Sequence, residues 1–237
     1  MKNKVALITG GSKGIGYGIA KALLEQDVHV AITSRSEAAA NTAASELNAL
    51  GLNARALGVQ ADVCDFESQQ KAVKQILTEF KQIDIVIANA GLGHFASIED
   101  LTLQQWQETI DTNLTGVFYT IKTTLDALKN SKGYFITISS LAGTNFFAKG
   151  SAYNASKFGL TGFTQSVMLD LRQYGVKVST IMPGSVSTYF NGNSPDDKDA
   201  WKIQIEDIGE LVVDLIKMNP RTLPSKIEVR PTMPPTK

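Results

Sequence analysis

The chain has little of what marks secreted, metal-binding or nucleic-acid-binding proteins. It has one cysteine in 237 residues, Cys64, so it cannot form an internal disulfide. Its two histidines form no cluster with metal-ligand spacing, and we expect no metal site. The 23 basic and 23 acidic residues give a formal net charge of zero, without a dense basic block. Bulk attraction to nucleic acid or to an anionic membrane is therefore unsupported.

Long hydrophobic runs are also missing. The apolar run that follows Met1–Lys4 is too short for the core of a signal peptide or for a membrane span, so we expect a cytoplasmic protein. Hydrophobic residues make up 43% of the chain and charged residues 19%, as in ordinary globular domains. At this length the chain is most simply one α/β domain, residues 1–237.

Short β-rich runs alternate with longer helical patterns. The expected strands are Val5–Thr9, Val28–Thr33, Asn53–Val59, Ile83–Ala88, Gly133–Ser139, Val176–Met182 and Lys226–Arg230. The expected helices are Gly14–Gln26, Glu37–Leu50, Phe66–Lys81, Gln104–Lys129, Ala152–Tyr174 and Glu206–Met218. Several strands are continuously apolar, as parallel strands covered on both faces are. The alternation predicts a doubly wound, seven-stranded parallel sheet with helices on both faces and right-handed crossovers.

A glycine-rich turn joins the first expected strand to the first helix. It reads Thr9-Gly-Gly-Ser-Lys-Gly-Ile-Gly16. Glycines permit a tight turn and let the backbone approach a pyrophosphate, and the helix N-terminus offers free N–H groups to that anion. Such a turn alone could be purely structural, but its place between the first strand and a helix indicates a dinucleotide site.

The end of the second expected strand is basic. A carboxylate there would bind the ribose 2′-hydroxyl of a dinucleotide and repel a 2′-phosphate. The chain instead has Ser34 and Arg35, and a guanidinium beside hydroxyls suits a phosphate. Lys13 in the glycine turn could add a second cation, although Arg35 could also be a solvated surface arginine. We predict that NADP(H) is preferred over NAD(H).

A tyrosine and a lysine lie four positions apart in a later helix. Tyr153 and Lys157 therefore share one helix face, about one turn apart. A nearby cation favours the ionised phenol and lowers its pKa from the usual value near ~10. Ser140 ends an apolar run, as at the end of a buried strand. A hydroxyl that faces such a phenol would suit proton delivery to a carbonyl, although the Tyr–Lys spacing alone also arises by chance.

Six motifs together resemble, in order and spacing, the short-chain dehydrogenase/reductases of the type called classical. They are Thr9-Gly-x-x-x-Gly14-x-Gly16, Asn89-Ala-Gly91, Asn113, Ser140, Tyr153-x-x-x-Lys157 and Pro183-Gly184. The resemblance extends to roughly Thr188 and implies a Rossmann-type fold and an oxidoreductase. It also implies a cofactor half at about 1–90, a catalytic half at about 91–188 and a substrate lid at about 188–205. We expect an irregular tail at 231–237.

The resemblance assigns cofactor contacts to five segments. Asn89 could equally stabilise the central strand. The implied contacts are Gly10, Ser12, Lys13, Gly14, Ile15 and Gly16 at the phosphates, Ser34 and Arg35 at the 2′-phosphate, Asp62 and Val63 at the adenine, Asn89, Ala90 and Gly91 along the ribose, and Pro183, Gly184, Val186 and Thr188 at the nicotinamide.

The implied catalytic residues are Asn113, Ser140, Tyr153 and Lys157. Tyr153 would give its proton to a carbonyl oxygen as hydride arrives, while Ser140 would hydrogen-bond that oxygen. Lys157 would bind the nicotinamide ribose and, with the oxidised ring, lower the tyrosine pKa. Asn113 would support a water that leads protons from Lys157 to solvent, or else be an ordinary polar helix residue. Ser139 is the alternative to Ser140, and only one of them can face the cleft because adjacent strand residues face opposite sides.

The region after Pro183 is expected to decide the substrate. Tyr189 and Phe190, in a segment that runs to Trp201, would form a lid, and Phe146 and Phe147 would add apolar wall. These aromatics suggest a neutral hydrophobic ketone or aldehyde, although they could equally be ordinary packing. His94 could rim the pocket or lie exposed in its loop.

Three hypotheses about function remain. The first is an NADP(H)-dependent carbonyl reductase or alcohol dehydrogenase. The second is a 3-oxoacyl-(acyl-carrier-protein) reductase, which would need a basic docking patch such as Lys129, Lys132 and Arg172. The third is a non-catalytic NADP-binding redox sensor, which the retained tyrosine and lysine disfavour.

We expect a small-molecule substrate and a homodimer or homotetramer, a dimer forming through the helices that carry Asn113 and Tyr153. The atypical C-terminus puts a tetramer in doubt.

Overall fold

Seven parallel strands form one sheet in the order β3-β2-β1-β4-β5-β6-β7. The structure is a computed structural model that describes residues 1–234. The chain adds β2 and β3 on one side of β1 and then crosses back to place β4 on its other side. The strands are β1 Val5–Thr9, β2 His29–Ser34, β3 Ala56–Gln60, β4 Ile85–Ala88, β5 Tyr134–Ile138, β6 Lys177–Pro183 and β7 Lys226–Val229.

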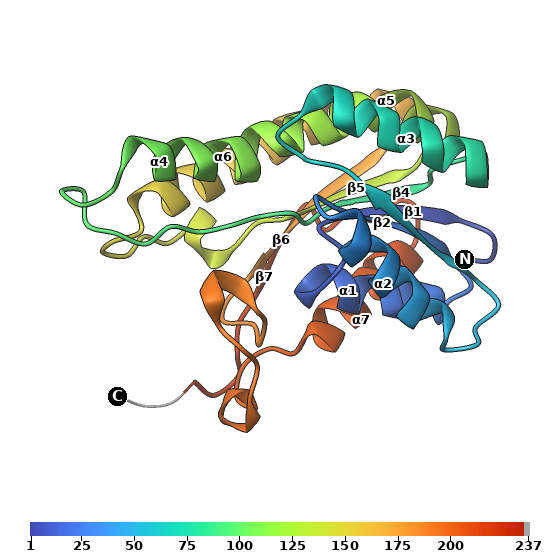
Figure 1. Ribbon diagram of the computed structural model, residues 1–237. Coiled ribbons are helices and arrows are strands. Elements are labelled where there is room, and N and C mark those ends of the chain that lie inside the picture. The colour runs from blue at the N-terminus through green and yellow to red at the C-terminus, as the bar shows by residue number, and fades with distance from the viewer. Residues whose placement is uncertain (235–237) are drawn as a thin grey trace.

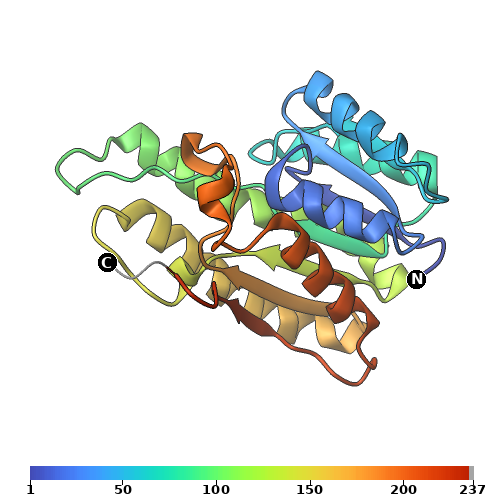
Figure 2. The ribbon, with the colours of Figure 1, turned by 90° about the horizontal axis from the view of Figure 1, so that it is seen from below.

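Helices cover both faces of the sheet (Figure 1). Figure 2 shows α1 (blue) beside α7 (red) on the lower face, and the two helices are in contact. The lower face carries α1 Gly14–Leu24, α2 Glu37–Asn48 and α7 Ile205–Lys217. The upper face carries α3 Phe66–Phe80, α4 Leu103–Ile110, α5 Gly116–Ser131 and α6 Ser151–Leu171. The predicted doubly wound Rossmann-type fold in one domain is confirmed.

Strand β1 shows why the inner strands are mainly apolar. All five of its residues are buried. Ala6 and Ile8 belong to the hydrophobic cluster under α1, α2 and α7, whereas Val5 and Leu7 belong to the cluster under α3, α5 and α6. Successive side chains point to opposite faces, so a strand with helices on both faces needs no polar position.

The crossover back to β4 brings the carboxyl ends of β1 and β4 together. At such a switch point the loops that follow the two strands diverge to opposite faces and leave a crevice. The glycine turn follows β1, and the segment that starts at Asn89 follows β4. The fold therefore places the predicted cofactor and catalytic segments together at the carboxyl ends of the strands.

The helix predicted as Gln104–Lys129 is interrupted. A π-helical turn, Asp111–Thr115, separates α4 from α5. The prediction of one regular helix is wrong because the apolar periodicity continues through a turn that carries one extra residue. π-Turns of this kind often occur at functional sites, and this one contains Asn113.

Other predicted boundaries are shifted by up to three residues. Strand β3 begins at Ala56, where the Asn48 side chain accepts from Ala56 N at 2.7 Å and donates to Ala56 O at 2.9 Å. Helix α6 ends at Leu171 in a 3₁₀ turn, followed by Gly175 at φ 72°. Of the predicted irregular tail, residues 231–234 carry no helix or strand, and 235–237 lie outside the described residues.

Two further observations concern residues 1–234. None of the helices in this range is both long and apolar enough to cross a membrane. Nor does this range bring together three or more His, Cys, Asp or Glu side chains that could hold a metal ion.

Candidate active site

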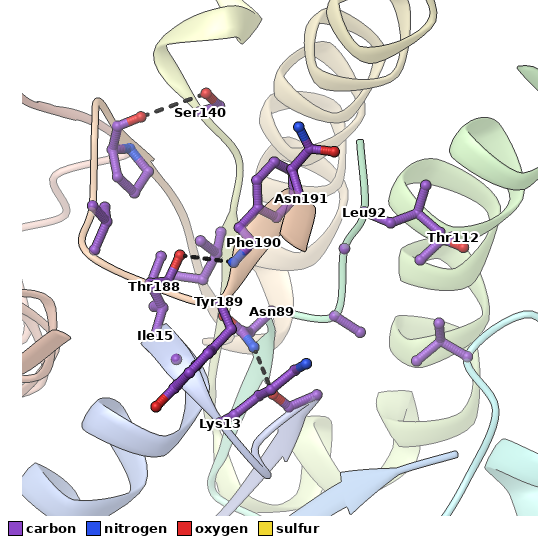
Figure 3. Close-up of a pocket in the computed structure, with 18 of the residues that line it drawn as sticks. Lys13, Ile15, Asn89, Leu92, Thr112, Ser140, Thr188, Tyr189, Phe190 and Asn191 are labelled. Carbon is purple, nitrogen blue, oxygen red and sulfur yellow. Dashed lines mark hydrogen bonds between the residues drawn. The ribbon is translucent and has the colours of Figure 1, made fainter. Parts of the chain in front are cut away.

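A cavity of about 590 Å³ lies at the carboxyl ends of the strands (Figure 3). It runs from Arg35 at one end to Ser140 and Tyr153 at the other. All the cofactor contacts that we predicted line it except Gly16, and of the predicted catalytic residues only Asn113 does not. Segments that are far apart in the sequence therefore meet around one cavity.

The glycine turn requires glycine at its first position. Gly10 has φ 64°, and a Cβ there would lie 2.9 Å from Ala90 Cα. The absence of this Cβ lets the turn lie directly against the end of β4. Lys13, the residue before α1, has extended backbone and gives no side-chain cap, and the first turn of α1 has no acidic residue. The unpaired N–H groups of α1 could therefore hold the phosphates of a dinucleotide.

Gly16 has a different place from the one we predicted. A Cβ on Gly16 would lie 2.6 Å from Asn89 Nδ2 and 2.7 Å from Gly10 O. Gly16 therefore lets α1 pack against the turn, and it does not line the cavity. A phosphate contact through the Gly16 backbone stays a prediction.

Asn89 holds the ends of β1 and β4 together. Its Nδ2 donates to Thr9 O at 2.9 Å and to Gly10 O at 3.1 Å. The backbone N–H groups of Asn89 and Ala90 donate to Thr9 Oγ1 at 3.0 and 3.1 Å. The strand-stabilising alternative for Asn89 is therefore present in the structure, although Asn89 also lines the cavity.

The far end of the cavity carries an exposed cation. Arg35 lines the cavity, and no ion pair among residues 1–234 engages it. Thr33, the second residue before it, also lines the cavity, and its Oγ1 is buried with no partner in the described part of the chain. A buried hydroxyl without a partner is costly unless a ligand or water satisfies it. The donors at this end therefore fit a ligand that carries acceptor oxygens.

Tyr153 and Lys157 both project from α6 into the other end of the cavity. Lys157 is buried, and its Nζ donates to Ile138 O at 3.0 Å and lies 5.7 Å from the centre of the Tyr153 ring. Burial lowers the pKa of Lys157 from 10.5 to about 8.

The pKa of Tyr153 corrects an expectation from the sequence. We predicted that the neighbouring cation lowers it, but burial raises the pKa of Tyr153 above 10.0 because the phenolate loses its hydration. A hydrogen bond with Ser140 opposes this effect only in part. In the protein without cofactor, desolvation outweighs the lysine.

The two adjacent serines point to different places. Ser140 Oγ accepts from Ala142 N at 3.1 Å and donates to Pro183 O at 3.5 Å, and it is near enough to the Tyr153 phenol to lower its pKa in part. Ser139 Oγ instead lies within hydrogen-bond distance of Lys157 O, at 3.3 Å, and of Thr161 Oγ1, at 3.2 Å. Ser140 is thus the serine that faces the phenol.

Asn113 is fully buried behind the cavity. Its Oδ1 accepts from Leu92 N at 2.9 Å, and its Nδ2 donates to Leu92 O at 2.8 Å and to Ser156 Oγ at 3.0 Å. The side chain therefore ties the π-turn to the segment after β4 and to α6. The predicted water is not tested by this geometry.

Asn154 is a positioning residue that the sequence analysis did not identify. Its Nδ2 donates to Ala142 O at 2.8 Å and to Asn145 O at 2.7 Å. These bonds hold the loop after Ser140 against α6. The residue stands next to Tyr153 in the sequence, but no sequence pattern indicates which loop carbonyls it reaches.

The predicted lid is anchored at its base. Ser187 N donates to Ile203 O at 2.9 Å, and Ile203 N donates to Ser185 O at 3.1 Å. Between these anchors Tyr189 and Phe190 project to opposite sides (Figure 3). The Tyr189 ring lies 6.0 Å from Lys13 Nζ, and the Phe190 ring centre lies 5.8 Å from that of Tyr153.

Two other aromatic neighbours of the site differ from expectation. Phe146 is 87% exposed and contributes no wall, whereas the ring of Phe95, which the sequence analysis did not consider, lies 5.3 Å from that of Tyr153. His94 forms an ion pair of 2.9 Å with Glu108 and does not line the cavity. Phe95 does not line the cavity either, but it borders the site through its contact with the Tyr153 ring.

Comparison with known proteins finds relatives over most of the chain. The short chain dehydrogenase family matches residues 4–199. The trans-4-hydroxycyclohexanecarboxylate dehydrogenase of Sinomonas cyclohexanicum is 35% identical over 217 residues, covering 86% of this chain and 83% of that protein. The 3-oxoacyl-(acyl-carrier-protein) reductase of Synechocystis is 35% identical over 192 residues, 80% of this chain and 77% of that protein. An alcohol dehydrogenase structure from the archaeon Thermococcus sibiricus, complexed with 5-hydroxy-NADP, has a TM-score of 0.91 and 30% identity over 99% of both chains.

Proposed function

Because the chain belongs to the classical short-chain dehydrogenase/reductase family, we propose that it is an NADP(H)-dependent oxidoreductase for carbonyl and alcohol substrates. The observation that carries this proposal is the meeting of Ser140, Tyr153 and Lys157 at one end of a cavity whose other end carries Arg35. The substrate is a small molecule, and the reaction joins hydride transfer to proton transfer.

The residues of the cavity fit NADP(H). The uncapped start of α1 and the close approach at Gly10 suit the pyrophosphate. Arg35, with Ser34 and the buried hydroxyl of Thr33 nearby, suits the 2′-phosphate, and Lys13 supplies a second cation. Asp62 and Val63 would flank the adenine, and the Pro183–Thr188 segment would hold the nicotinamide. The 5-hydroxy-NADP in the Thermococcus sibiricus structure supports the same choice.

The mechanism assigns a separate task to each catalytic side chain. Bound NADPH supplies the hydride. Tyr153, whose raised pKa keeps the phenol protonated at neutral pH, gives its proton to the carbonyl oxygen. Ser140 donates a hydrogen bond to the same oxygen and stabilises the charge that develops there.

Lys157 and Asn113 support this proton transfer. A pKa of about 8 lets Lys157 take up and release a proton near neutral pH, so it can restore the proton that Tyr153 loses. Asn113 fixes the Leu92 backbone and α6 relative to each other through its three hydrogen bonds. Its predicted support of a water between Lys157 and solvent stays part of the proposal.

The apolar side of the cavity favours a neutral, hydrophobic ketone or aldehyde. The basic residues considered for acyl-carrier-protein docking do not support the second hypothesis. Lys129 and Lys132 directly precede β5, and Arg172 lies in the turn that leads to β6, so all three lie at the amino ends of strands. The cavity lies at the carboxyl ends of the strands, on the opposite side of the molecule from these three residues. The presence of Ser140, Tyr153 and Lys157 argues against a non-catalytic redox sensor.

We also infer a cytoplasmic homo-oligomer. Helices α5 and α6 expose Phe118 at 43%, Phe158 at 43% and Leu169 at 56%. Large apolar side chains gathered on neighbouring helices suit a subunit interface. A dimer through this surface follows the arrangement that the sequence resemblance implies.

The experiment that tests the proposed function is an NADPH-oxidation screen at 340 nm. It covers aldehydes, ketones, diketones, quinones and 3-oxoacyl thioesters, with NADH in parallel. We expect oxidation of NADPH that depends on a hydrophobic ketone or aldehyde. Selective turnover of 3-oxoacyl thioesters would favour the second hypothesis. Tight NADPH binding with no turnover of any carbonyl, and no NADP⁺ reduction by the matching alcohols, would contradict an enzymatic role.

A further inference from the structure

Four aromatic rings from separate segments gather in one cluster, in which two rings contact that of Tyr153. Phe95 follows β4, Phe147 precedes α6, Tyr153 lies within α6, and Phe190 belongs to the lid. We call these four residues the ring cluster. The Tyr153 ring centre lies 5.3 Å from that of Phe95 and 5.8 Å from that of Phe190. Phe95 in turn lies 6.3 Å from Phe190 and 5.9 Å from Phe147.

Phe95 meets Tyr153 and Phe190 edge to face, the remaining pairs are tilted, and none of the four pairs is a parallel stack. The interplanar angles are 65° for Phe95 with Tyr153, 66° for Phe95 with Phe190 and 54° for Tyr153 with Phe190. In this arrangement the positive edge of one ring meets the negative face of another, which favours aromatic partners over saturated ones of similar size. The cluster therefore offers ring faces and edges to a further aromatic ring.

The backbone is shaped to allow these contacts. A Cβ on Gly93 would lie 2.9 Å from Phe190 Cζ and 2.9 Å from Phe95 Cζ, so a side chain at this position would displace both rings from their present places. Phe190 is followed by Asn191 at φ 56° and Gly192 at φ 76°, two residues in the left-handed region. The lid turns sharply directly after the ring that it places beside Tyr153.

The cluster is close to the reacting group and incompletely covered. Phe95 is 38% exposed and Phe147 is 48% exposed, although both are large and apolar. The cations nearest the cavity on this side are engaged, since Lys157 is buried with its Nζ on Ile138 O and Lys202 is paired with Asp199 at 2.6 Å. A substrate carboxylate would find both of these cations already engaged, whereas an uncharged ring would cover exposed aromatic surface.

From this geometry we propose that the substrates are uncharged aryl ketones or aldehydes, with Phe95 and Phe190 as the residues that select the aromatic ring. A carbonyl oxygen that reaches both Ser140 and Tyr153 places its substituents beside the rings that flank Tyr153. The substrate ring then lies against Phe95 and Phe147, and Phe190 closes over it from the lid. This inference rests on the proposed function and narrows its substrate to one class.

The test compares two ketones that differ only in the ring. In 1-phenylpropan-2-one and 1-cyclohexylpropan-2-one a methylene separates the ring from the carbonyl, so the carbonyls have nearly the same intrinsic reactivity. The measured quantity is the ratio of kcat/KM for the aryl ketone to that for the cyclohexyl ketone, with NADPH. We expect a ratio of about 10 for the unaltered protein, which corresponds to about 1.4 kcal/mol. Phe95→Leu and Phe190→Leu should each lower the ratio to about 1–2 while both ketones are still reduced.

Phe146→Leu is the matched control, because Phe146 is 87% exposed and pairs with no ring in the cluster. It should keep the ratio of the unaltered protein, and thermal unfolding should show that each variant is folded. A ratio near 1 in the unaltered protein would overturn the inference. So would an unchanged ratio in both Phe95→Leu and Phe190→Leu.

A binding experiment distinguishes two failures: the protein could lack the proposed enzymatic function, or it could lack the preference for aromatic rings. If neither ketone is reduced, and the NADPH-oxidation screen finds no other carbonyl substrate, the proposed function fails. Saturation-transfer NMR with the same two ketones then decides whether the ring cluster binds aromatic rings. Stronger saturation of the phenyl than of the cyclohexyl protons, lost in Phe95→Leu and kept in Phe146→Leu, supports the aryl site. Equal saturation of the two rings overturns it.

Discussion

The two sides of the cavity are built from different parts of the chain. On the cofactor side the main chain sets the shape: the turn at Gly10, the uncapped start of α1 and the ends of adjacent strands. On the substrate side the shape comes from side chains, since Tyr153 and Phe190 line the cavity and Phe95 packs against both from a third segment. Main-chain geometry leaves a local sequence pattern, whereas a meeting of distant rings does not. The family can therefore keep one cofactor side while the substrate side varies.

The largest expected effect separates chemistry from binding. Tyr153→Phe removes the proton donor but keeps the ring that packs with Phe95 and Phe190. We expect turnover to fall about 10³-fold, because a positioned general acid contributes about 10²–10⁴-fold. The affinity for NADPH, measured by fluorescence titration, should change less than about twofold. Tyr174→Phe removes a hydroxyl at the opposite edge of the sheet and should leave both quantities unchanged. Turnover near the normal rate in Tyr153→Phe would exclude it as the proton donor.

Charge reversal at Arg35 tests the cofactor side alone. Arg35→Asp should weaken NADPH binding about 10–100-fold, since a hydrogen bond to a charged group contributes about 1.5–3 kcal/mol. NADH binding should change little, because NADH has no 2′-phosphate. Arg221→Asp makes the same change at an exposed residue before β7 and should affect neither cofactor. Equal losses for the two cofactors would mean that Arg35 does not contact the 2′-phosphate.

Lys157 lies between the cofactor side and the substrate side of the cavity. Because its side chain is buried, we predict that replacing it with an apolar residue stabilises the folded protein. In the folded protein its pKa is about 8 instead of 10.5, so below pH 8 the folded state carries a poorly hydrated charge. Lys157→Met removes that cost but also loses the hydrogen bond to Ile138 O. We expect a net gain of about 1–2 kcal/mol at pH 7, or about 2–8 °C in Tm, for the protein without cofactor.

The stability gain expected of Lys157→Met also depends on pH, in a direction that follows from the lowered pKa of Lys157. Between about pH 8 and 10.5 the folded protein releases the Lys157 proton while the unfolded chain keeps it. The unfavourable contribution of Lys157 to the stability therefore diminishes as the pH rises through this window, and the advantage of Lys157→Met shrinks. Lys122→Met, at an exposed position of α5, should show no such trend. A Tm advantage that is absent at pH 7, or that grows towards pH 10, would contradict the buried-charge account.

The features that could be predicted from the sequence are those set by local main-chain geometry, and the features that were missed depend on contacts between distant segments. The turn from Gly10 to Gly14 and the pair Tyr153 and Lys157 lie within single local segments, so secondary structure alone fixed their geometry. The position of Phe95 beside Tyr153 depends on a long loop, and no local pattern indicates it. The π-turn at Asp111–Thr115 interrupts a helix without interrupting its apolar periodicity.

The error about the Tyr153 pKa has the same origin. Helical spacing correctly predicted that Lys157 lies close to the phenol, with its Nζ 5.7 Å from the ring centre. It could not predict how deeply both groups are buried, and burial is the largest cause of both pKa shifts. Charge proximity is a local property of the sequence, whereas desolvation depends on every element that covers the site.

The central claim is that this cavity transfers hydride directly to a carbonyl carbon, and isotope tracing tests it most directly. A single turnover with NADPH deuterated on one face of nicotinamide C4, and separately on the other, is followed by mass spectrometry of the alcohol. We predict that the alcohol gains one deuterium on its carbinol carbon from one labelled form only, and that Tyr153→Phe slows its appearance about 10³-fold. Alcohol that contains no deuterium from either form, or as much from both, would contradict the account.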